Sequence, residues 1–422
     1  MSANHFYSIA IHFSTFLRGK KTIAPLMPVV SRIIPDEISG DIREMNGQWV
    51  GRYSGTSNGL ALVDIEDLGE DYLVQAYLID DDTKMPLAMV AFRVSNKSKT
   101  FSQKQVYIQP INPHTSEPTD WDRIKEAYPG ANFPKSAEVE GSWDENNLTF
   151  KWNTDIQTKG ECILPRSKAE SPSEYKAIPS INNWDDFKKE IACNLVPIGT
   201  GRRFLFRGQN DGWRLRTKFH RLGRTNLYKF LFEDKKSLHA HLSFRTRHIF
   251  DLNKGEENGA FLNLIQHHGY PTPLLDWTFS PFVAAFFAYR GIKKQEASEA
   301  KEDRKVRIFV FDQQEWKKDT QPVLSLTWPL PYLSIMEFIA IDNERMIPQQ
   351  AVSIVSNIDD IESHIRTKEA DKKKEYLRII ELPWSERKRV MHELSIMGIT
   401  AGSLFPGIDG VCEEMRERLF EK

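Results

Sequence analysis

Two short segments of the sequence combine residues that can bind an anion with residues that can bind a sugar or an aromatic ring. Arginine presents a planar guanidinium that holds a phosphate or a carboxylate through two parallel hydrogen bonds, and neighbouring aromatic residues supply an apolar wall. This combination is typical of a nucleotide pocket. The first segment reads Phe206, Arg207, Gly208 and Gln209, and the second reads Asp276, Trp277, Thr278, Phe279 and Ser280.

The first segment lies in a strongly basic part of the chain. Between residues 201 and 224, Asp211 is the only acidic residue among several arginines. We therefore expect Arg207 to hold a pyrophosphate or a phosphoribose, and Gly208 to let that ligand approach the backbone. The alternative is a buried structural arginine that forms an ion pair with the carboxylate of Asp276.

The second segment leads into an apolar helix that we expect to be fully buried. Ser280 can cap the free amides of this helix, and Pro281 at its first position loses no needed donor. Because the amide end of a helix favours negative charge, Thr278 and Ser280 are also candidates to bind a sugar or a phosphate. Capping alone explains Ser280 equally well, and core packing alone explains Trp277.

Other kinds of catalytic site find no support in the sequence. The adjacent histidines His267 and His268 point in different directions on a helix or a strand, so we expect no metal site. Neither a nucleophile elbow nor a glycine-rich phosphate loop occurs. Three widely spaced cysteines, Cys162, Cys193 and Cys412, favour reduced thiols in the cytoplasm without disulfides.

The overall composition indicates a soluble globular protein. Its 57 basic and 58 acidic residues give a net charge of -1, which argues against bulk nucleic-acid binding. No apolar run approaches the length of a membrane-spanning helix, and no secretion signal is recognisable. We therefore expect a cytoplasmic protein without membrane contact.

The chain of 422 residues is long enough for two domains. After an N-terminal extension at residues 1–40, short runs of alternating apolar residues predict an antiparallel barrel or sandwich at residues 41–165. Its opening segment, residues 47–53, is similar to the start of a lipocalin-like barrel. A polar linker at residues 166–182 then leads to an α+β domain at residues 183–422.

Several motifs in the second domain occur in an order that is typical of a known family. They are Phe206 to Gln209, Gln266 to Thr272, Leu274 to Thr278, Asn343 to Arg345 with Gln349 and Gln350, and Met397 to Gly410. Together these motifs resemble the FRG domain. The resemblance runs from Trp184 to the C-terminus and leaves the N-terminal β domain unassigned.

The resemblance implies a divergent ADP-ribosyltransferase fold, in which a split mixed sheet grips NAD, and a role in bacterial defence or as a toxin. Arg207 would hold the nicotinamide ribose or a phosphate, and Thr278 with Ser280 would occupy the place of that fold's serine-threonine-serine strand end. The implied catalytic residues are Arg207, Asp276, Thr278, Glu344, Gln349 and Gln350. The implied NAD-binding residues are Phe206, Arg207, Gly208, Gln209, His268, Trp277, Thr278 and Ser280.

The sequence departs from the pattern of active transferases at the position of a catalytic glutamate. Gln349 or Gln350 falls where those enzymes carry a glutamate, whose charge stabilises the developing cation. Losing such a contact costs about 3–4 kcal/mol. Glu344 or Glu337 would have to turn inward to replace it.

Three functions are compatible with these residues. The first is an enzyme that binds NAD and passes ADP-ribose to a macromolecule or to water. The second is a module that senses a nucleotide without turnover and passes the signal to the β domain. The third is an interaction protein whose β domain recognises a protein partner.

Overall fold

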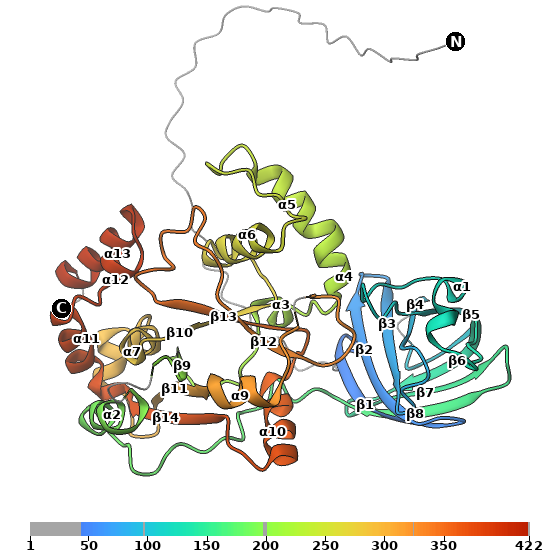
Figure 1. The fold of residues 1–422 in the computed structure, drawn as a ribbon. Helices are drawn as coiled ribbons and strands as arrows, with labels where there is room; N and C mark the ends of the chain where they lie inside the picture. Colours follow the sequence, from blue (N-terminus) through green and yellow to red (C-terminus); the bar gives the residue numbers. More distant parts are fainter. Residues whose placement is uncertain (1–43, 96–97, 197–200, 324, 421–422) are drawn as a thin grey trace, which may run out of the picture. The chain divides into compact units, whose positions relative to one another are not determined.

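The computed structural model describes residues 44–420, except residues 96–97, 197–200 and 324 (Figure 1). The N-terminal extension expected at residues 1–40 lies outside this part of the chain. The described residues form a closed barrel of eight strands, followed by a six-stranded sheet with helices around it. The first part is therefore all-β and the second is α+β, as the sequence predicts.

The β domain is a closed antiparallel barrel rather than a sandwich. Its strands are β1 (Gly47–Gly55), β2 (Gly59–Asp67), β3 (Asp71–Asp80), β4 (Ala88–Ser95), β5 (Thr100–Pro110), β6 (Ser136–Trp143), β7 (Asn147–Thr154) and β8 (Lys159–Pro165). Each strand pairs with the next in sequence, and β1 closes the circle by pairing with β8. Closure gives every strand two neighbours, so no sheet edge is left unpaired.

The alternation of residues along each strand decides which side chains fill the barrel. On β2, Ala61, Val63 and Ile65 point inward and are almost fully buried. Successive side chains of a strand point to opposite faces, so Asp64 and Glu66 lie on the outer face of the same strand. Both carboxylates are nevertheless buried.

Contacts with the second part of the chain bury this outer face. Gln48 donates hydrogen bonds to Asp64 and to the backbone oxygen of Asn357, while its own side-chain oxygen accepts one from the N–H of Asp359. Glu66 accepts bonds from two backbone N–H groups of the second part. Burial raises the pKa of Asp64 to about 8, although the hydrogen bond from Gln48 opposes this shift.

The segment 166–182, which we expected to be a linker, has no helix or named strand but is tied to the second part by its side chains. Ser167 donates a hydrogen bond to Asp359, and Ser173 donates one to a carboxylate at the start of a later helix. The hydroxyl of Tyr175 donates to Glu369. This segment therefore packs along the second part rather than hanging free from it.

The sheet of the second part consists of two halves that meet at one residue pair. Its strands are β9 (Phe204–Gln209), β10 (Leu274–Thr278), β11 (Lys305–Asp312), β12 (Leu333–Met336), β13 (Ala351–Ser356) and β14 (Leu377–Pro383), in the order β12-β13-β10-β9-β11-β14. In the described chain β10 and β9 share the single register pair Thr278 and Phe206, whereas the other neighbours pair over four to seven residues. The two halves can therefore separate on either side of this pair.

The mixed sheet implied by the family resemblance is wrong for these strands. Every pairing between named strands of the sheet is antiparallel. The chain crosses the sheet in opposite directions in each neighbouring pair, so the parallel crossover that a mixed sheet needs does not occur among them.

Helices pack on both faces of this sheet (Figure 1). The described helices are α1 (Trp121–Ile124), α2 (Trp184–Glu190), α3 (Lys218–Arg221), α4 (Leu227–Lys229), α5 (Lys235–Leu242), α6 (Gly255–His267), α7 (Pro281–Tyr289), α8 (Lys294–Ser298), α9 (Gln313–Asp319), α10 (Ile361–Lys372), α11 (Arg387–Ile396), α12 (Ala401–Leu404) and α13 (Ile408–Leu419). On β9, Phe206 belongs to the core shared with α2, α7 and α11, while its neighbour Leu205 belongs to the core shared with α9 and α10. Alternate residues of one strand thus hold both helical layers in place.

Candidate functional site

A cavity of about 300 Å³ lies where the two halves of the sheet separate. Its walls come from β9, β10, α6 and α7, and from two later segments of the chain. The lining residues are Phe206, Arg207, Gly208, Gln266, His267, Asp276, Trp277, Thr278, Ala284, Phe287, Arg345, Gln349, Ala351 and Phe405. The fold therefore brings parts of all five sequence motifs to one place.

Arg207 links the two halves of the sheet beside their single register pair. Its Nη1 donates a hydrogen bond of 2.5 Å to the backbone oxygen of Asp276. Its Nε is buried and has no hydrogen-bond partner among the described residues. Burial lowers the pKa of Arg207 to about 10, while the charge of Asp276 opposes this shift, so the guanidinium stays protonated at neutral pH.

The carboxylate of Asp276 is held in place on one side only. Its Oδ2 accepts a hydrogen bond of 3.0 Å from the amide of Gln266, and the hydroxyl of Thr272 in turn donates to the other end of that amide. Its Oδ1 is buried without a partner in the described structure. The ion pair between this carboxylate and Arg207, the alternative from the sequence, does not form, because Arg207 bonds to the backbone oxygen instead.

Arg345 brings a second positive charge to the cavity. Its guanidinium donates to the backbone oxygen of His267 and lies 5.4 Å from the centre of the Phe405 ring.

The ring of His267, which also lines the cavity, contacts Asn343. The amide nitrogen of Asn343 lies 2.7 Å from Nδ1 of His267 and donates to Asn263 at the same distance. If Nδ1 accepts from that amide, the neutral ring of His267 carries its proton on Nε2.

Thr278 and Gln349 lie side by side at the cavity. The hydroxyl of Thr278 donates a hydrogen bond of 2.7 Å to the backbone oxygen of Gln349 and accepts one from the backbone N–H of Ser280. The side-chain amide of Gln349 donates to the backbone oxygen of Leu404 at 2.8 Å. The donor end of Gln349 is thus fixed by the fold.

Gly208 is required by packing between β9 and α7. A Cβ atom at this position would lie 1.9 Å from the backbone oxygen of Ala284 and 2.6 Å from the backbone nitrogen of Ala288. We expected this glycine to let a ligand approach the backbone, but packing against the helix alone explains why a glycine is needed. The helix, rather than a ligand, occupies the space that a side chain would need.

Trp277 has the surroundings of a core residue. Its ring packs against Phe311 at a centroid distance of 5.8 Å, and only 3% of its surface is exposed. Its Nε1 is buried without a hydrogen-bond partner in the described chain. The ring itself is therefore engaged in packing, and Nε1 is the part of Trp277 that remains to bind a ligand.

Three of the implied NAD-binding residues do not line the cavity. Gln209 donates from its side chain to the backbone oxygen of Trp213. Ser280 accepts from the backbone N–H of Val283 and so caps α7, as the capping interpretation predicts. His268 is exposed beyond the end of α6.

Neither of the glutamates that we considered as replacements for the missing one turns inward. Glu344 and Glu337 are exposed, and Glu337 pairs with Arg202 at 3.7 Å. Gln350 is also exposed and adopts a positive φ of 47°. Arg345 turns inward in their place. Asp276 is consequently the acidic residue among the lining residues.

Sequence reasoning missed several residues of the cavity. Gln266, His267 and Arg345 occur in the quoted motifs, but their type and spacing did not indicate which of them would face a ligand. Phe287 and Phe405 come from the buried helix and the tail. The described residues contain no group of three potential metal ligands, and no helix in them is long and apolar enough to cross a membrane.

Comparisons with known proteins bear on this half of the chain. A search of curated proteins found no match. Among solved structures, a redesigned β-barrel matches with 11% identity and a TM-score of 0.20, over 29% of this chain and 90% of that one, and this score is too low to indicate a shared fold. Residues 202–297, which lie in the C-terminal half of the chain and supply Arg207, Asp276 and most of the cavity, match the family model of the FRG domain.

Proposed function

We propose that the cavity between β9 and β10 binds one phosphoribosyl half of a nucleotide such as NAD, and that this binding is a sensing event without turnover. The fit of the residues supports a nucleotide, and the shortage of carboxylates favours sensing over transfer.

The observation that carries the proposal is a set of unused polar atoms in the lining residues. Nε of Arg207, Oδ1 of Asp276 and Nε1 of Trp277 are buried without hydrogen-bond partners in the described structure. An unpaired buried polar group costs about 1–3 kcal/mol, so a ligand that pairs these atoms gains that energy on binding. The two donors suit phosphate oxygens, and the acceptor suits a ribose hydroxyl.

The charges of the cavity favour an anionic ligand. Arg207 and Arg345 contribute two positive charges, and Asp276 contributes one negative charge. Arginine binds phosphate oxygens through charge-assisted hydrogen bonds, which are stronger than neutral ones. The carboxylate of Asp276 can at the same time accept a hydrogen bond from a sugar hydroxyl.

The volume of the cavity limits how much of a dinucleotide it can hold. About 300 Å³ lies at the lower end of the range for small-molecule pockets, which is roughly 300–1,000 Å³. One nucleotide half is therefore the part that fits, and the other half of NAD would lie outside. ADP-ribose or a mononucleotide should bind through the same contacts.

The arrangement argues against efficient transfer of ADP-ribose. Stabilising an oxocarbenium-like transition state needs a fixed negative charge beside the anomeric carbon, and the carboxylate that the lining residues offer, Asp276, comes from β10 and not from the position of the missing glutamate. Gln349 is neutral and donates to Leu404, and the exposed Glu344 does not line the cavity. The observation that favours a transferase is the contact between Thr278 and Gln349, which are two of the implied catalytic residues.

Binding is tested by titrating NAD, ADP-ribose and AMP into the full-length protein by calorimetry. We expect all three to bind and Arg207→Gln to weaken binding about tenfold to a hundredfold, since a hydrogen bond to a charged group is lost. Arg202→Gln is the matched control, because this exposed neighbour stacks on Phe279 and does not line the cavity. Equal binding by wild type and Arg207→Gln would contradict the site.

Turnover is tested by measuring nicotinamide release from NAD, with and without a cell lysate as acceptor. We expect binding without release. Release that disappears in Arg207→Gln but not in Arg202→Gln would show that the same cavity belongs to an enzyme, and the sensing half of the proposal would then be wrong.

A further inference from the structure

The interior of the N-terminal barrel changes character along its length. At one end, large side chains fill it and leave almost no surface exposed. These side chains are Trp49, Tyr72, Trp143, Leu148 and Leu164. They lie at the start of β1, β3 and β7 and at the end of β6 and β8, which is one and the same end of an antiparallel barrel. This end is therefore closed by packing.

Toward the other end, three inward positions carry small residues. Ala61 on β2 and Ala137 on β6 point inward near the opposite ends of their strands, and Ala76 points inward from the middle of β3. Their methyl groups cannot reach the centre of the barrel. A cavity of about 330 Å³ results, and these three alanines are part of its wall.

The cavity leaves large apolar side chains without full cover. Leu78, Val90, Phe92, Ile108 and Trp152 all line it, and each belongs to the barrel core but is only partly buried. In a closed barrel, inward residues should be fully covered, because the sheet shields them from the outside. Their remaining exposure therefore faces the cavity, and an apolar ligand would remove it from water.

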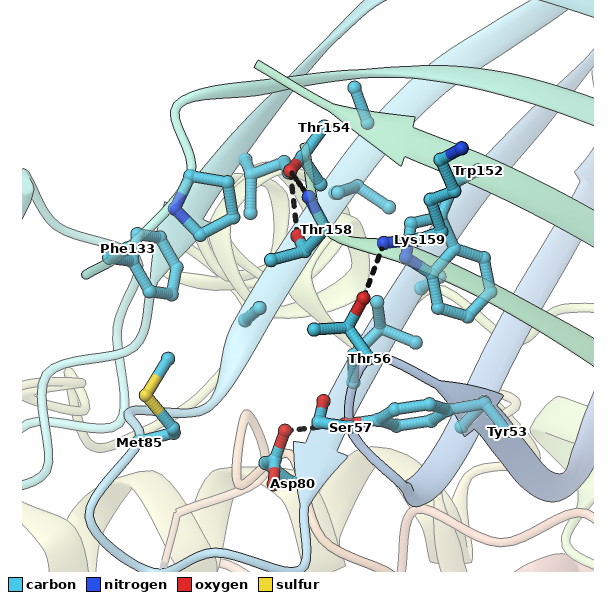
Figure 2. Close-up of a pocket in the computed structure, with 18 of the residues that line it drawn as sticks. Tyr53, Thr56, Ser57, Asp80, Met85, Phe133, Trp152, Thr154, Thr158 and Lys159 are labelled. Atoms are coloured by element: carbon cyan, nitrogen blue, oxygen red, sulfur yellow. Dashed lines mark hydrogen bonds between the residues drawn. The ribbon is translucent and has the colours of Figure 1, made fainter. Parts of the chain in front are cut away.

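Hydrogen-bonding groups lie at the rim of this cavity (Figure 2). The hydroxyl of Tyr53 donates to Asp80 at 3.2 Å, and the hydroxyls of Thr154 and Thr158 lie 2.7 Å apart. Ser57, also at the rim, is exposed, so the cavity reaches solvent here. Phe133 and Met85, from the connections between strands, extend over the same opening in Figure 2.

We propose that the barrel binds a compact apolar small molecule, about two rings in size, whose single hydroxyl or amine lies among the rim groups. The size follows from the volume, since an apolar cavity of about 150 Å³ holds one benzene ring and this one is roughly twice as large. A macromolecule is too large for an interior enclosed by eight strands. The site is independent of the nucleotide cavity in the FRG half.

The test uses the fluorescent probe 1-naphthylamine, an apolar two-ring amine, with the full-length protein. We expect saturable binding by wild type, and at least about tenfold weaker binding by Ala76→Leu and by Ala137→Leu, which fill the cavity from two different strands. Ala91→Leu is the matched control, since Ala91 lies on the exposed outer face of β4. Thermal unfolding establishes that each variant is folded, and two filling variants guard against the failure of one.

Unchanged binding in a folded filling variant, or no binding by wild type, would overturn the proposal.

Discussion

The barrel and the FRG half of the chain each enclose a cavity, and the two cavities are similar in volume but opposite in chemistry. The barrel cavity, of about 330 Å³, has walls of alanine, valine and aromatic side chains, whereas the cavity of about 300 Å³ in the second sheet contains two arginines and an aspartate. Volume therefore says little about the ligand. The side chains on the wall decide whether a ligand is favoured by burial of apolar surface or by pairing of charges.

The two cavities also arise in different ways. In the barrel every strand pairs with two neighbours, over three residues at the narrowest contacts, and small side chains leave the space. In the second sheet the backbone itself separates, because β9 and β10 share one register pair, and Arg207 bridges the gap. The fold around the barrel cavity should therefore tolerate changes of side-chain size, whereas the fold around the second cavity should depend on individual hydrogen bonds.

The largest expected effect contrasts the packed and hollow ends of the barrel. Leu148→Ala should cost about 2–5 kcal/mol of unfolding free energy, because it opens a new cavity among fully buried neighbours. Leu78→Ala should cost distinctly less, because Leu78 already borders open space. Urea unfolding of both variants measures the difference, and equal losses would mean that the barrel is packed alike at its two ends.

The junction of β9 with α7 gives the next largest effect. Gly208→Ala should destabilise the protein by about 3 kcal/mol, since the new methyl group would collide with backbone atoms of α7. Gly212→Ala is the control, because the nearest atom to its added Cβ is a flexible arginine nitrogen at 3.4 Å. Thermal and urea unfolding provide the measurement. Comparable stability of the two variants would show that α7 does not pack this closely against β9.

Restoring the missing carboxylate should harm the fold more than it helps the chemistry. Gln349→Glu removes the donor to Leu404 and leaves two oxygens facing each other, at an expected cost of about 1–3 kcal/mol. We expect lower thermal stability and no nicotinamide release. Gln350→Glu serves as the control because Gln350 is exposed. The appearance of turnover in Gln349→Glu would instead favour a transferase ancestry for the site.

The smallest effect concerns the one large carboxylate shift on the outside of the barrel. The pKa of Asp64 is raised to about 8 in the folded protein, above the value near 4 of an unfolded aspartate, so stability falls as the pH rises through this window. Asp64→Asn keeps an acceptor for Gln48 and cannot ionise. We expect it to stabilise the protein at pH 8, where the carboxyl of the wild type ionises, and to have little effect at pH 4. Stability curves against pH check this, and an equal effect at both pH values would contradict it.

The architecture was largely readable from the sequence, whereas the shapes of the cavities were not. Period-two alternation predicted the strands of the barrel, because one face of each strand must be buried. The cavity depends on Ala61, Ala76 and Ala137 meeting across a closed circle, and no local pattern reveals which residues meet. Strand direction in the second sheet is likewise a tertiary property, and the expected mixed sheet was wrong for this reason.

The candidate site was predicted in part. The motifs around Arg207 and Asp276 contain the residues that line the cavity, since the type and order of residues indicated anion binding. The part of the site that we did not predict lies in the irregular segment before β13, where Arg345 rather than Glu344 faces inward. A segment without regular structure has no repeating pattern of apolar residues, so its sequence does not indicate which side chains point inward. The role in bacterial defence implied by the family resemblance stays a prediction.

The most direct test of the account is a crossed binding measurement on one protein. ADP-ribose and 1-naphthylamine are titrated separately into wild type, Arg207→Gln and Ala76→Leu. We predict that Arg207→Gln weakens only ADP-ribose binding and that Ala76→Leu weakens only probe binding. Loss of both ligands in the same folded variant, or unchanged binding of each ligand in its own variant, would contradict the claim of two chemically distinct sites.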